Sequence, residues 1–294
     1  MKKLAALLLA LIMVFSFVSC DESTTPSSGS NGENSAQSET KKEITFTEAV
    51  AVDNAECSIK ITGIDPNNYM GFTLKAQLEN KSAEKTYMFS IEKASVNGVQ
   101  TSPLFASEVA AGKKSNDTIS FMDDDELKEN GVGDFTDIEL TFRVYDSNDW
   151  MADEVARETV HIYPYGEDKA VNFVREAKDS DNVIVDNESV TVIVTGYEED
   201  TFYGYSVNMF LLNKTDKEIM FTANEVSVNG FMVDPLFANS VSGGKCAFAS
   251  MTWFDTTFEE NGITDVEEIE FILRAYDYNN WSADFANETI TLNP

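Results

Sequence analysis

The sequence predicts an all-β protein of two tandem antiparallel β-sandwiches, and two observations carry this prediction. The first is that a long stretch of the chain occurs twice, most clearly as RVYDSNDWMAD at Arg143–Asp153 and RAYDYNNWSAD at Arg274–Asp284. The second is that each copy contains many short runs of alternating apolar and polar residues, separated by turn residues. Short strands at such regular spacing are typical of β-sandwiches.

Shorter strings recur in the same order, with an offset that drifts by only a few residues. They are SVNG (Ser95–Gly98 and Ser227–Gly230), PLFA (Pro103–Ala106 and Pro235–Ala238) and ENG (Glu129–Gly131 and Glu260–Gly262). Collinear repetition of this kind favours a duplicated domain over chance similarity. We therefore place repeat 1 at residues 44–164, a connector at 165–181 and repeat 2 at 182–294.

Strands are predicted wherever apolar residues recur with a period of two, as between Phe72 and Glu79. In repeat 1 the expected strands are Glu56–Ile64, Phe72–Glu79, Thr86–Val96, Thr118–Met122, Ile138–Tyr145 and Glu158–Tyr163. In repeat 2 they are Val190–Tyr197, Tyr205–Leu212, Glu218–Val228, Ala247–Phe254, Glu268–Tyr276 and Glu288–Leu292. Asn97-Gly98 and Asn229-Gly230 predict hairpin turns, because Asn and Gly tolerate positive φ.

One short helical turn is expected in each sandwich. In repeat 2, Asp255 is expected to cap a turn over residues 256–261 that ends at Gly262 in the left-handed conformation. Repeat 1 offers Asp124 or Asp125 at the start of its turn and Gly131 at the end. The acidic run in which these aspartates lie is thus interpreted as a helix cap and dipole partner rather than as a metal site.

A connector helix is predicted between the repeats, over Glu167–Lys178. Pro164 ends the last strand of repeat 1, and a helix after it would carry an apolar stripe. The stripe consists of Ala170, Phe173, Val174 and Ala177. A striped connector is expected to pack on one or both sandwiches and hold them in a fixed relation.

The N-terminus predicts export and lipid anchoring. Lys2 and Lys3 precede the apolar run Leu4–Val18, which is followed by Ser19 and Cys20. This pattern is typical of a signal peptide at residues 1–19, with Cys20 as the lipidated residue of a bacterial lipobox; a plain secretory signal is the alternative. Residues 20–43 are polar and Ser-rich and predict a disordered tether. We expect the protein at the extracytoplasmic face of the cell membrane.

The charge argues against anionic partners, and the cysteine positions argue against a disulfide within either repeat. The formal net charge is −30, which becomes −32 once Lys2 and Lys3 are removed with the signal. Such an excess argues against nucleic acid and against direct adhesion to anionic lipid. Cys57 and Cys246 do not fall at matching positions of the two repeats, so we expect free thiols, with a bond between them as the alternative.

With these features together, the chain resembles the tandem-repeat surface lipoproteins of Gram-positive bacteria. The resemblance covers the whole chain, and its most specific parts are SVNG, ENGxxD and RxYDxNxWxAD. It implies immunoglobulin-like repeats and a lipid anchor. No activity comes with the resemblance.

Catalysis has little support in the sequence. His161 is the single histidine of the chain and stands where repeat 2 has Thr291. A lone histidine without repeated partners is more often structural than catalytic or metal-bound. Carboxylate pairs suited to glycoside hydrolysis carry no weight without geometry. We therefore expect no enzyme and no cofactor.

The hairpin string RxYDxNxWxAD is the best candidate for a ligand-binding site. Its candidate residues are Asp146, Asn148 and Trp150 in repeat 1 and Asp277, Asn279 and Trp281 in repeat 2. With Asp153 or Asp284, their oxygens surround one turn as in a calcium loop, and the Trp offers a face for a sugar. The alternative is structural, because Asp and Asn favour turns. We predict that Asp146 and Asp277 brace their turns and that both Trp side chains pack on their own sandwiches.

A second candidate is an aromatic group near the start of one strand. It comprises Tyr69 and Phe72 in repeat 1 and Phe202, Tyr203 and Tyr205 in repeat 2. On the same strand, Phe210 and Leu212 stand where repeat 1 has Gln77 and Glu79. An apolar face of repeat 2 is therefore expected either to contact the connector and the other repeat or to bind a partner.

These observations predict a non-enzymatic recognition or structural protein of the cell envelope, with a protein, envelope polymer or glycan as partner. The alternative is a calcium-assisted carbohydrate-binding module that uses the two hairpin tips.

Overall fold

The computed structural model describes residues 43–294, except residue 202. The predicted signal, Cys20 and the tether up to residue 42 therefore lie outside the described residues. Lys42–Pro294 form one compact unit. In the part of the chain that the structure describes, no helix is long and apolar enough to cross a membrane.

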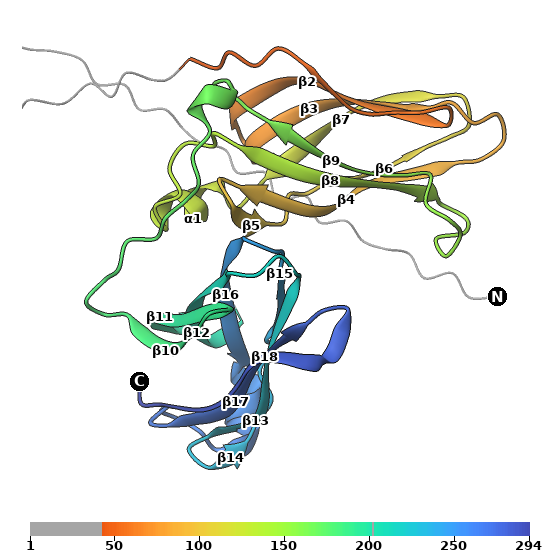
Figure 1. Cartoon of the computed structure of the whole chain (residues 1–294). Coiled ribbons are helices and arrows are strands. Elements are labelled where there is room, and N and C mark those ends of the chain that lie inside the picture. The colour runs from red at the N-terminus through yellow and green to blue at the C-terminus, as the bar shows by residue number, and fades with distance from the viewer. Residues whose placement is uncertain (1–42, 202) are drawn as a thin grey trace, which may run out of the picture. The chain divides into compact units, whose positions relative to one another are not determined.

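Repeat 1 consists of two antiparallel sheets over one core (Figure 1). The first sheet has the order β1 (Ala49–Asp53), β2 (Cys57–Asn68), β3 (Gly71–Asn80) and β7 (Lys114–Phe121). The second contains β4 (Tyr87–Val96), β5 (Val99–Thr101), β6 (Ala106–Val109), β8 (Ile138–Asp146) and β9 (Ala156–Ile162). The predicted alternation positions the side chains, because Leu74 and Leu78 are buried whereas Lys75 and Gln77 face solvent.

Repeat 2 has the same architecture, element for element. Its first sheet has the order β10 (Asn182–Asp186), β11 (Val190–Thr201), β12 (Gly204–Asn213) and β16 (Cys246–Phe254). Its second contains β13 (Ile219–Val228), β14 (Phe231–Met232), β15 (Ala238–Val241), β17 (Ile269–Asp277) and β18 (Asn280–Leu292). The predicted all-β fold of two tandem immunoglobulin-like sandwiches is confirmed.

Each sandwich carries one short helix, as predicted, but neither helix has the predicted aspartate cap at its start. The helices are α1 (Asp124–Glu129) and α2 (Asp255–Asn261). Gly262 ends α2 in the left-handed conformation with φ of 68°. Asp255 is the first residue of α2 rather than its cap, and neither helix start has a side-chain capping bond.

The predicted connector helix is wrong. Only η1 (Glu167–Lys169), a single 3-10 turn, is helical, and residues 170–178 have no regular structure. The backbone N–H of Phe173 instead donates to the carbonyl oxygen of Asn97 in repeat 1, at 2.7 Å. This bond replaces the one that a helix would form within the connector. Without a helix, the four residues of the expected stripe do not lie on one face. Ala170, Val174 and Ala177 are exposed.

The connector does pack on repeat 2, as predicted, but of the four stripe residues only Phe173 makes this contact. The Phe173 ring packs edge-on against Phe210 and Phe248, with ring centroids 6.4 and 5.9 Å apart. Arg175 lies over the Phe210 ring and forms a two-pronged ion pair with Asp181, both bonds 2.6 Å long. This pair lowers the pKa of Asp181 to about 2. The apolar face of repeat 2 is thus covered by the connector.

The two repeats also meet directly, at the edges of two sheets. A parallel bridge pairs Cys246 of β16 with Val99 of β5, which makes one continuous sheet across the junction. The Gln100 side chain donates to the carbonyl oxygen of Ser240 and accepts from the backbone N–H of Ser242. Two ion pairs flank this contact, each 2.7 Å long: Lys93 with Glu218 and Lys245 with Glu139.

Both described cysteines are free and buried, as expected. Burial raises the pKa of Cys57 to about 11 and that of Cys246 to about 12. These thiols are therefore protonated at neutral pH and act as small apolar side chains.

The core of repeat 2 contains a buried hydroxyl that repeat 1 lacks. Tyr205 stands where repeat 1 has Phe72, and its hydroxyl makes no hydrogen bond among the described residues. Burial, together with nearby Tyr197 and Glu199, raises its pKa to about 12. An unpartnered buried polar group costs free energy of folding.

We expect Tyr205→Phe to raise the free energy of unfolding by about 1 kcal/mol, because it removes that cost and keeps the ring. Urea denaturation measures the change. The matched control is Phe72→Tyr, which adds a hydroxyl in repeat 1 and should lower stability. An unchanged or lower stability of Tyr205→Phe would contradict the assignment of an unpartnered hydroxyl.

Candidate functional site

The two RxYDxNxWxAD strings form hairpin tips, one at the end of β8 and one spanning the end of β17, the turn and the start of β18. In repeat 1, a carboxylate oxygen of Asp146 accepts from the backbone N–H of Asn148 at 3.0 Å. Its other oxygen pairs with Lys85 at 3.4 Å. This is the bracing role predicted for Asp146. Asn148 contributes its backbone N–H to that bond.

The tip of repeat 2 is braced in the same way but more tightly. Asp277 accepts from the backbone N–H of Asn279 at 2.9 Å and from Lys217 at 2.7 Å. Its exposed fraction is only 6%. The Lys217 ammonium, followed by the Asn279 N–H, lowers the pKa of Asp277 below its ordinary value. The prediction that Asp277 braces its own turn is confirmed.

An arginine clamps each tip, and sequence reasoning missed this role. Arg274 donates to the backbone carbonyl of Trp281 and to Asp284, and it stacks 4.4 Å above the Tyr276 ring. Arg143 stands in the same position of repeat 1. It donates to the carbonyl of Trp150 and to Glu154 and lies 4.4 Å above Tyr145. The arginine is part of the repeated string, so its repetition was the available signal.

Both tip tryptophans project into solvent, and the prediction that they pack on their own sandwiches is wrong. Trp150 is 66% exposed and Trp281 is 76% exposed. The arginine clamp holds the backbone carbonyl of each tryptophan, so the tip is fixed by its main chain and the indole is left outside. Trp253, by contrast, is fully buried in the core of repeat 2.

The tip carboxylates do not fit a calcium ion. Asp277 is bound to Lys217, and Asp284 is bound to Arg274. Calcium requires six to eight oxygen ligands. Among the residues that the structure describes, no three His, Cys, Asp or Glu side chains are grouped so as to hold a metal ion. The aspartates are structural groups of the turns.

The predicted aromatic group is divided by the fold. Phe72 and Tyr205 lie in the cores, whereas Tyr69 and Tyr203 are 93% and 58% exposed. Residue 202 lies outside the described part of the chain. The structure therefore leaves Tyr203 as an exposed aromatic residue of repeat 2, packed edge-on against Phe254 with ring centroids 6.3 Å apart.

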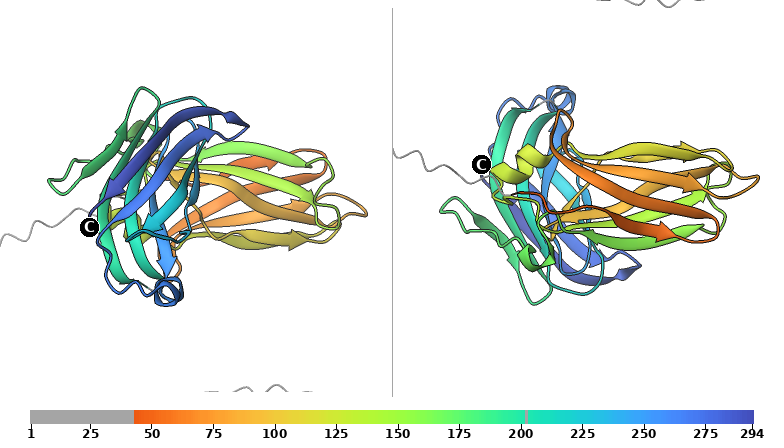
Figure 2. Two further views of the ribbon diagram at one scale, coloured as in Figure 1. Left: turned by 90° about the horizontal axis from the view of Figure 1, so that it is seen from below. Right: turned by 90° about the horizontal axis from the view of Figure 1, so that it is seen from above.

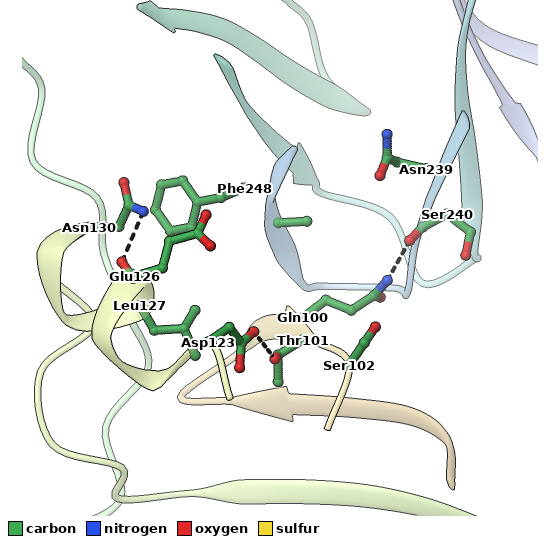
Figure 3. A pocket seen from close by; sticks show the side chains of 11 residues that line it. Gln100, Thr101, Ser102, Asp123, Glu126, Leu127, Asn130, Asn239, Ser240 and Phe248 are labelled. Atoms are coloured by element: carbon green, nitrogen blue, oxygen red, sulfur yellow. Dashed lines mark hydrogen bonds between the residues drawn. The ribbon is translucent and has the colours of Figure 1, made fainter. Parts of the chain in front are cut away.

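A polar cavity of about 220 Å³ lies where α1 meets repeat 2 (Figure 3). Figure 2 shows α1 beside the strands of repeat 2. The cavity is lined by Gln100, Thr101, Ser102, Asp123, Glu126, Leu127, Asn130, Asn239, Ser240, Ala247 and Phe248. Thr101 donates to one oxygen of Asp123, and the other is buried and makes no bond among the described residues.

The chemistry of this cavity is acidic and neutral. Burial, and then the charges of Asp123 and Glu198, raise the pKa of Glu126. None of the lining residues is His, Cys, Lys or Arg, so the charged groups of the lining are the carboxylates of Asp123 and Glu126. Sequence reasoning missed it because its walls come from segments more than a hundred residues apart, such as Thr101 and Phe248.

His161 has the structural surroundings that were expected. Its ring pairs with Asp137 at 2.7 Å and with Glu139 at 3.4 Å, and stacks on Tyr163 at 5.7 Å. Glu139 also binds Lys245 of repeat 2. His161 thus belongs to a charge network beside the repeat junction.

Comparisons with known proteins add little to this geometry. No model of a known protein family matches the chain, and no curated protein matches it. Among solved structures, a similar one is the chaperone–tip adhesion subunit pre-assembly complex of the archaic chaperone-usher Csu pili of Acinetobacter baumannii. It is 11% identical with a TM-score of 0.22, and the match covers 74% of this chain and 90% of that one. A likeness this weak does not bear on function.

If the tip aspartates are structural, Asp277→Ala lowers the melting temperature in the absence of calcium. The pKa of Asp277 is lowered in the folded state, so its stabilisation is present at neutral pH and is lost as the pH falls through that lowered pKa. Wild type and variant should therefore converge in acid. Thermal melts at neutral and acidic pH measure this.

The control for this test is Asp149→Asn. Asp149 is exposed in the tip of repeat 1, and the tip of repeat 2 has Asn280 at the same position, so stability should be unchanged. A wild-type melting temperature that rises with added calcium, and a variant that loses the rise, would show a metal site instead.

Proposed function

We propose that this protein is a non-enzymatic recognition protein of the cell envelope, held at the extracytoplasmic face of the membrane by a lipid on Cys20. Its two hairpin tips bind a protein or an envelope polymer. The observation that carries the proposal is that both repeats hold an exposed tryptophan, Trp150 and Trp281, on a tip whose main chain is clamped by arginine.

Exposed tryptophans on rigid tips suit recognition better than they suit folding. An indole buries a large apolar area on contact with a partner, at a low cost in conformational entropy. Tryptophan is accordingly enriched among residues that dominate binding energy. In each tip the fold requires the aspartate and the arginine, which brace and clamp the turn. It does not require the exposed indole, which is nevertheless present in both copies.

The composition supports an envelope address and limits the partners. The net charge of −30 disfavours nucleic acid and anionic surfaces. The signal-like N-terminus ending in Cys20 supports attachment to the membrane through a lipid. A tether of polar residues between Cys20 and the first sandwich would let the tips reach a partner away from the membrane surface.

A second candidate function is glycan binding at the same tips, which the exposed indoles favour because an aromatic face stacks on a sugar ring. At the tip of repeat 2 this candidate does not involve calcium, because the carboxylates of Asp277 and Asp284 are held by Lys217 and Arg274.

The tips can be tested by tryptophan fluorescence. The chain has three tryptophans, and the buried Trp253 serves as an internal reference. Titration with solubilised envelope polymers and with a panel of glycans should shift the emission of wild type. Trp150→Ala and Trp281→Ala should each weaken binding by about tenfold or more, the loss typical of a dominant contact residue.

The matched control is Tyr278→Ser, which gives tip 2 the residue that tip 1 has at Ser147 and should leave binding unchanged. Binding that both tryptophan variants retain would contradict the proposal. When the full chain is expressed in bacterial cells, Cys20→Ser should release the protein from the membrane fraction. A variant that stays in the membrane fraction would contradict the lipid anchor.

A further inference from the structure

The PLFA string has a feature that packing does not explain. Its phenylalanines, Phe105 and Phe237, are buried in the two cores, as a fold requirement predicts. Its leucines are 59% exposed at Leu104 and 57% exposed at Leu236. Each leucine is nevertheless fixed by two backbone hydrogen bonds, Leu104 to Ser120 and Leu236 to Thr252. Both repeats thus hold an apolar side chain rigidly in solvent.

In repeat 2 this leucine is the end of a row that crosses four segments. Strand register places Glu198 opposite Ser206, Ser206 opposite Thr252, and Thr252 opposite Leu236. The Ser206 and Thr252 hydroxyls share a hydrogen bond of 2.8 Å. The side-chain amide of Asn208 donates to Glu198 at 2.8 Å. The row therefore runs from a carboxylate, through two hydroxyls, to an apolar side chain.

A hollow of about 400 Å³ lies over this row. Its lining consists of Glu198, Tyr203, Ser206, Leu236, Ser250 and Thr252. Tyr203 and Leu236 form its apolar part, and the hydroxyls and the carboxylate form its polar part. The volume falls within the range of roughly 300–1,000 Å³ that small-molecule sites occupy.

The division of the lining selects the chemistry of the ligand. A pyranose ring has an apolar face of C–H groups and an edge of hydroxyls, so it matches an aromatic and aliphatic wall beside hydroxyl and carboxylate groups. An apolar peptide side chain would take water from the Glu198 carboxylate, whose bond from Asn208 satisfies only part of its acceptor capacity, and that desolvation is costly. An anionic ligand would meet the Glu198 carboxylate and the net charge of the chain.

Repeat 1 keeps the row but not the aromatic wall. Its register places Asp65 opposite Thr73, Thr73 opposite Ser120, and Ser120 opposite Leu104. At the positions of Tyr203 and Phe254, however, repeat 1 has Met70 and Met122. Without an aromatic ring at either of these two positions, the site of repeat 1 lacks the stacking wall that Tyr203 provides in repeat 2.

From this geometry we propose that the hollow over the Glu198–Leu236 row is a binding site for one neutral pyranose unit of a glycan. The sugar stacks on Tyr203 and Leu236, and its hydroxyls bond to Glu198, Ser250 and Thr252. The site is separate from the tryptophan tips and does not depend on the function proposed for them.

The test is a titration of the wild-type protein with the methyl pyranosides of glucose, galactose, mannose and N-acetylglucosamine. Binding is monitored through the chemical shifts of the backbone amides. At least one should shift the amides of Leu236 and Thr252 in a saturable manner. Tyr203→Met, which installs the residue of repeat 1, should weaken that binding by about tenfold through loss of the stacking contact.

Two further variants separate the alternatives. Glu198→Gln should also weaken pyranoside binding, since a charged acceptor makes a stronger hydrogen bond than an amide does. If Glu198→Gln leaves pyranoside binding unchanged or improves it, Glu198 does not bond to the sugar and the proposal is wrong. The double variant Met70→Tyr with Met122→Phe should create a second set of pyranoside-induced shifts, at Leu104 and Ser120.

Trp150→Ala with Trp281→Ala should leave pyranoside binding at this hollow unchanged, so failure of the tip proposal and failure of this one are distinguishable. The absence of any saturable shift at Leu236 and Thr252 with all four pyranosides would overturn the inference. So would shifts that Tyr203→Met leaves unaltered while its circular dichroism stays that of wild type.

Discussion

The buried side chain of Asn97 holds the junction on which the arrangement of the two repeats depends. The side-chain oxygen Oδ1 of Asn97 accepts from the backbone N–H groups of Thr136 and Asp137 and from the Thr136 hydroxyl. Its amide nitrogen donates to the carbonyl oxygens of Val132 and Asp134. An amide that is 1% exposed and bonded through both ends fixes its turn in one conformation. The φ of Asn97 is 52°, which asparagine tolerates better than most residues.

The connector and β16 of repeat 2 both form hydrogen bonds to this turn. The backbone carbonyl oxygen of Asn97 accepts from the N–H of Phe173 in the connector, at 2.7 Å. The carbonyl oxygen of Gly98 accepts from the N–H of Cys246 in β16, at 3.1 Å. The same turn thus anchors the segment whose Phe173 ring contacts repeat 2 and the strand β16 that is bridged to β5. A motif that serves the interior of each sandwich therefore also serves the junction in repeat 1.

The second copy of the turn shows what the duplication kept and what it released. Asn229 binds its own loop as Asn97 does, accepting from the N–H groups of Glu267 and Glu268 and donating to the carbonyl of Asp265. The strand that follows it, β14, is exposed at Phe231 and Met232. The intra-repeat role is thus common to both copies, and the junction belongs to repeat 1 alone.

The sequence predicted the features that are local or repeated. Alternation predicted the longer strands but not the short strands β1, β5, β6, β10, β14 and β15. Gly262 predicted the end of α2, and the repeated Asp277 predicted a braced turn. The connector helix was predicted from a local stripe and failed, because Phe173 bonds to Asn97, a residue 76 positions away that no local pattern includes.

The prediction that the tip tryptophans pack on their own sandwiches was wrong for a related reason. Repetition shows that a residue is required, and it does not show whether the requirement comes from the core or from a surface. Trp150 and Trp281 are as well kept as the buried phenylalanines of PLFA, yet they are exposed. The hollow over Glu198 and Leu236 was beyond sequence reasoning, because strand register alone brings its lining together.

The division between the two sandwiches is also a division of surfaces. Repeat 2 carries Phe210 and Phe248 on a face where the connector packs. The same face of repeat 1 has Gln77 and Asn116, which bond to each other at 3.4 Å in solvent. Repeat 2 therefore offers the connector an apolar surface to pack on, and the matching face of repeat 1 does not.

The most direct measurement is amide hydrogen exchange at Phe173 and Cys246, whose N–H groups bond to the Asn97–Gly98 turn. Both amides should exchange slowly in wild type, although Phe173 lies in a segment without regular structure. They should exchange much faster in Asn97→Ala and remain slow in Asn229→Ala, which damages the equivalent turn of repeat 2. Wild-type amides at Phe173 and Cys246 that exchange as fast as those of an open loop would contradict the account.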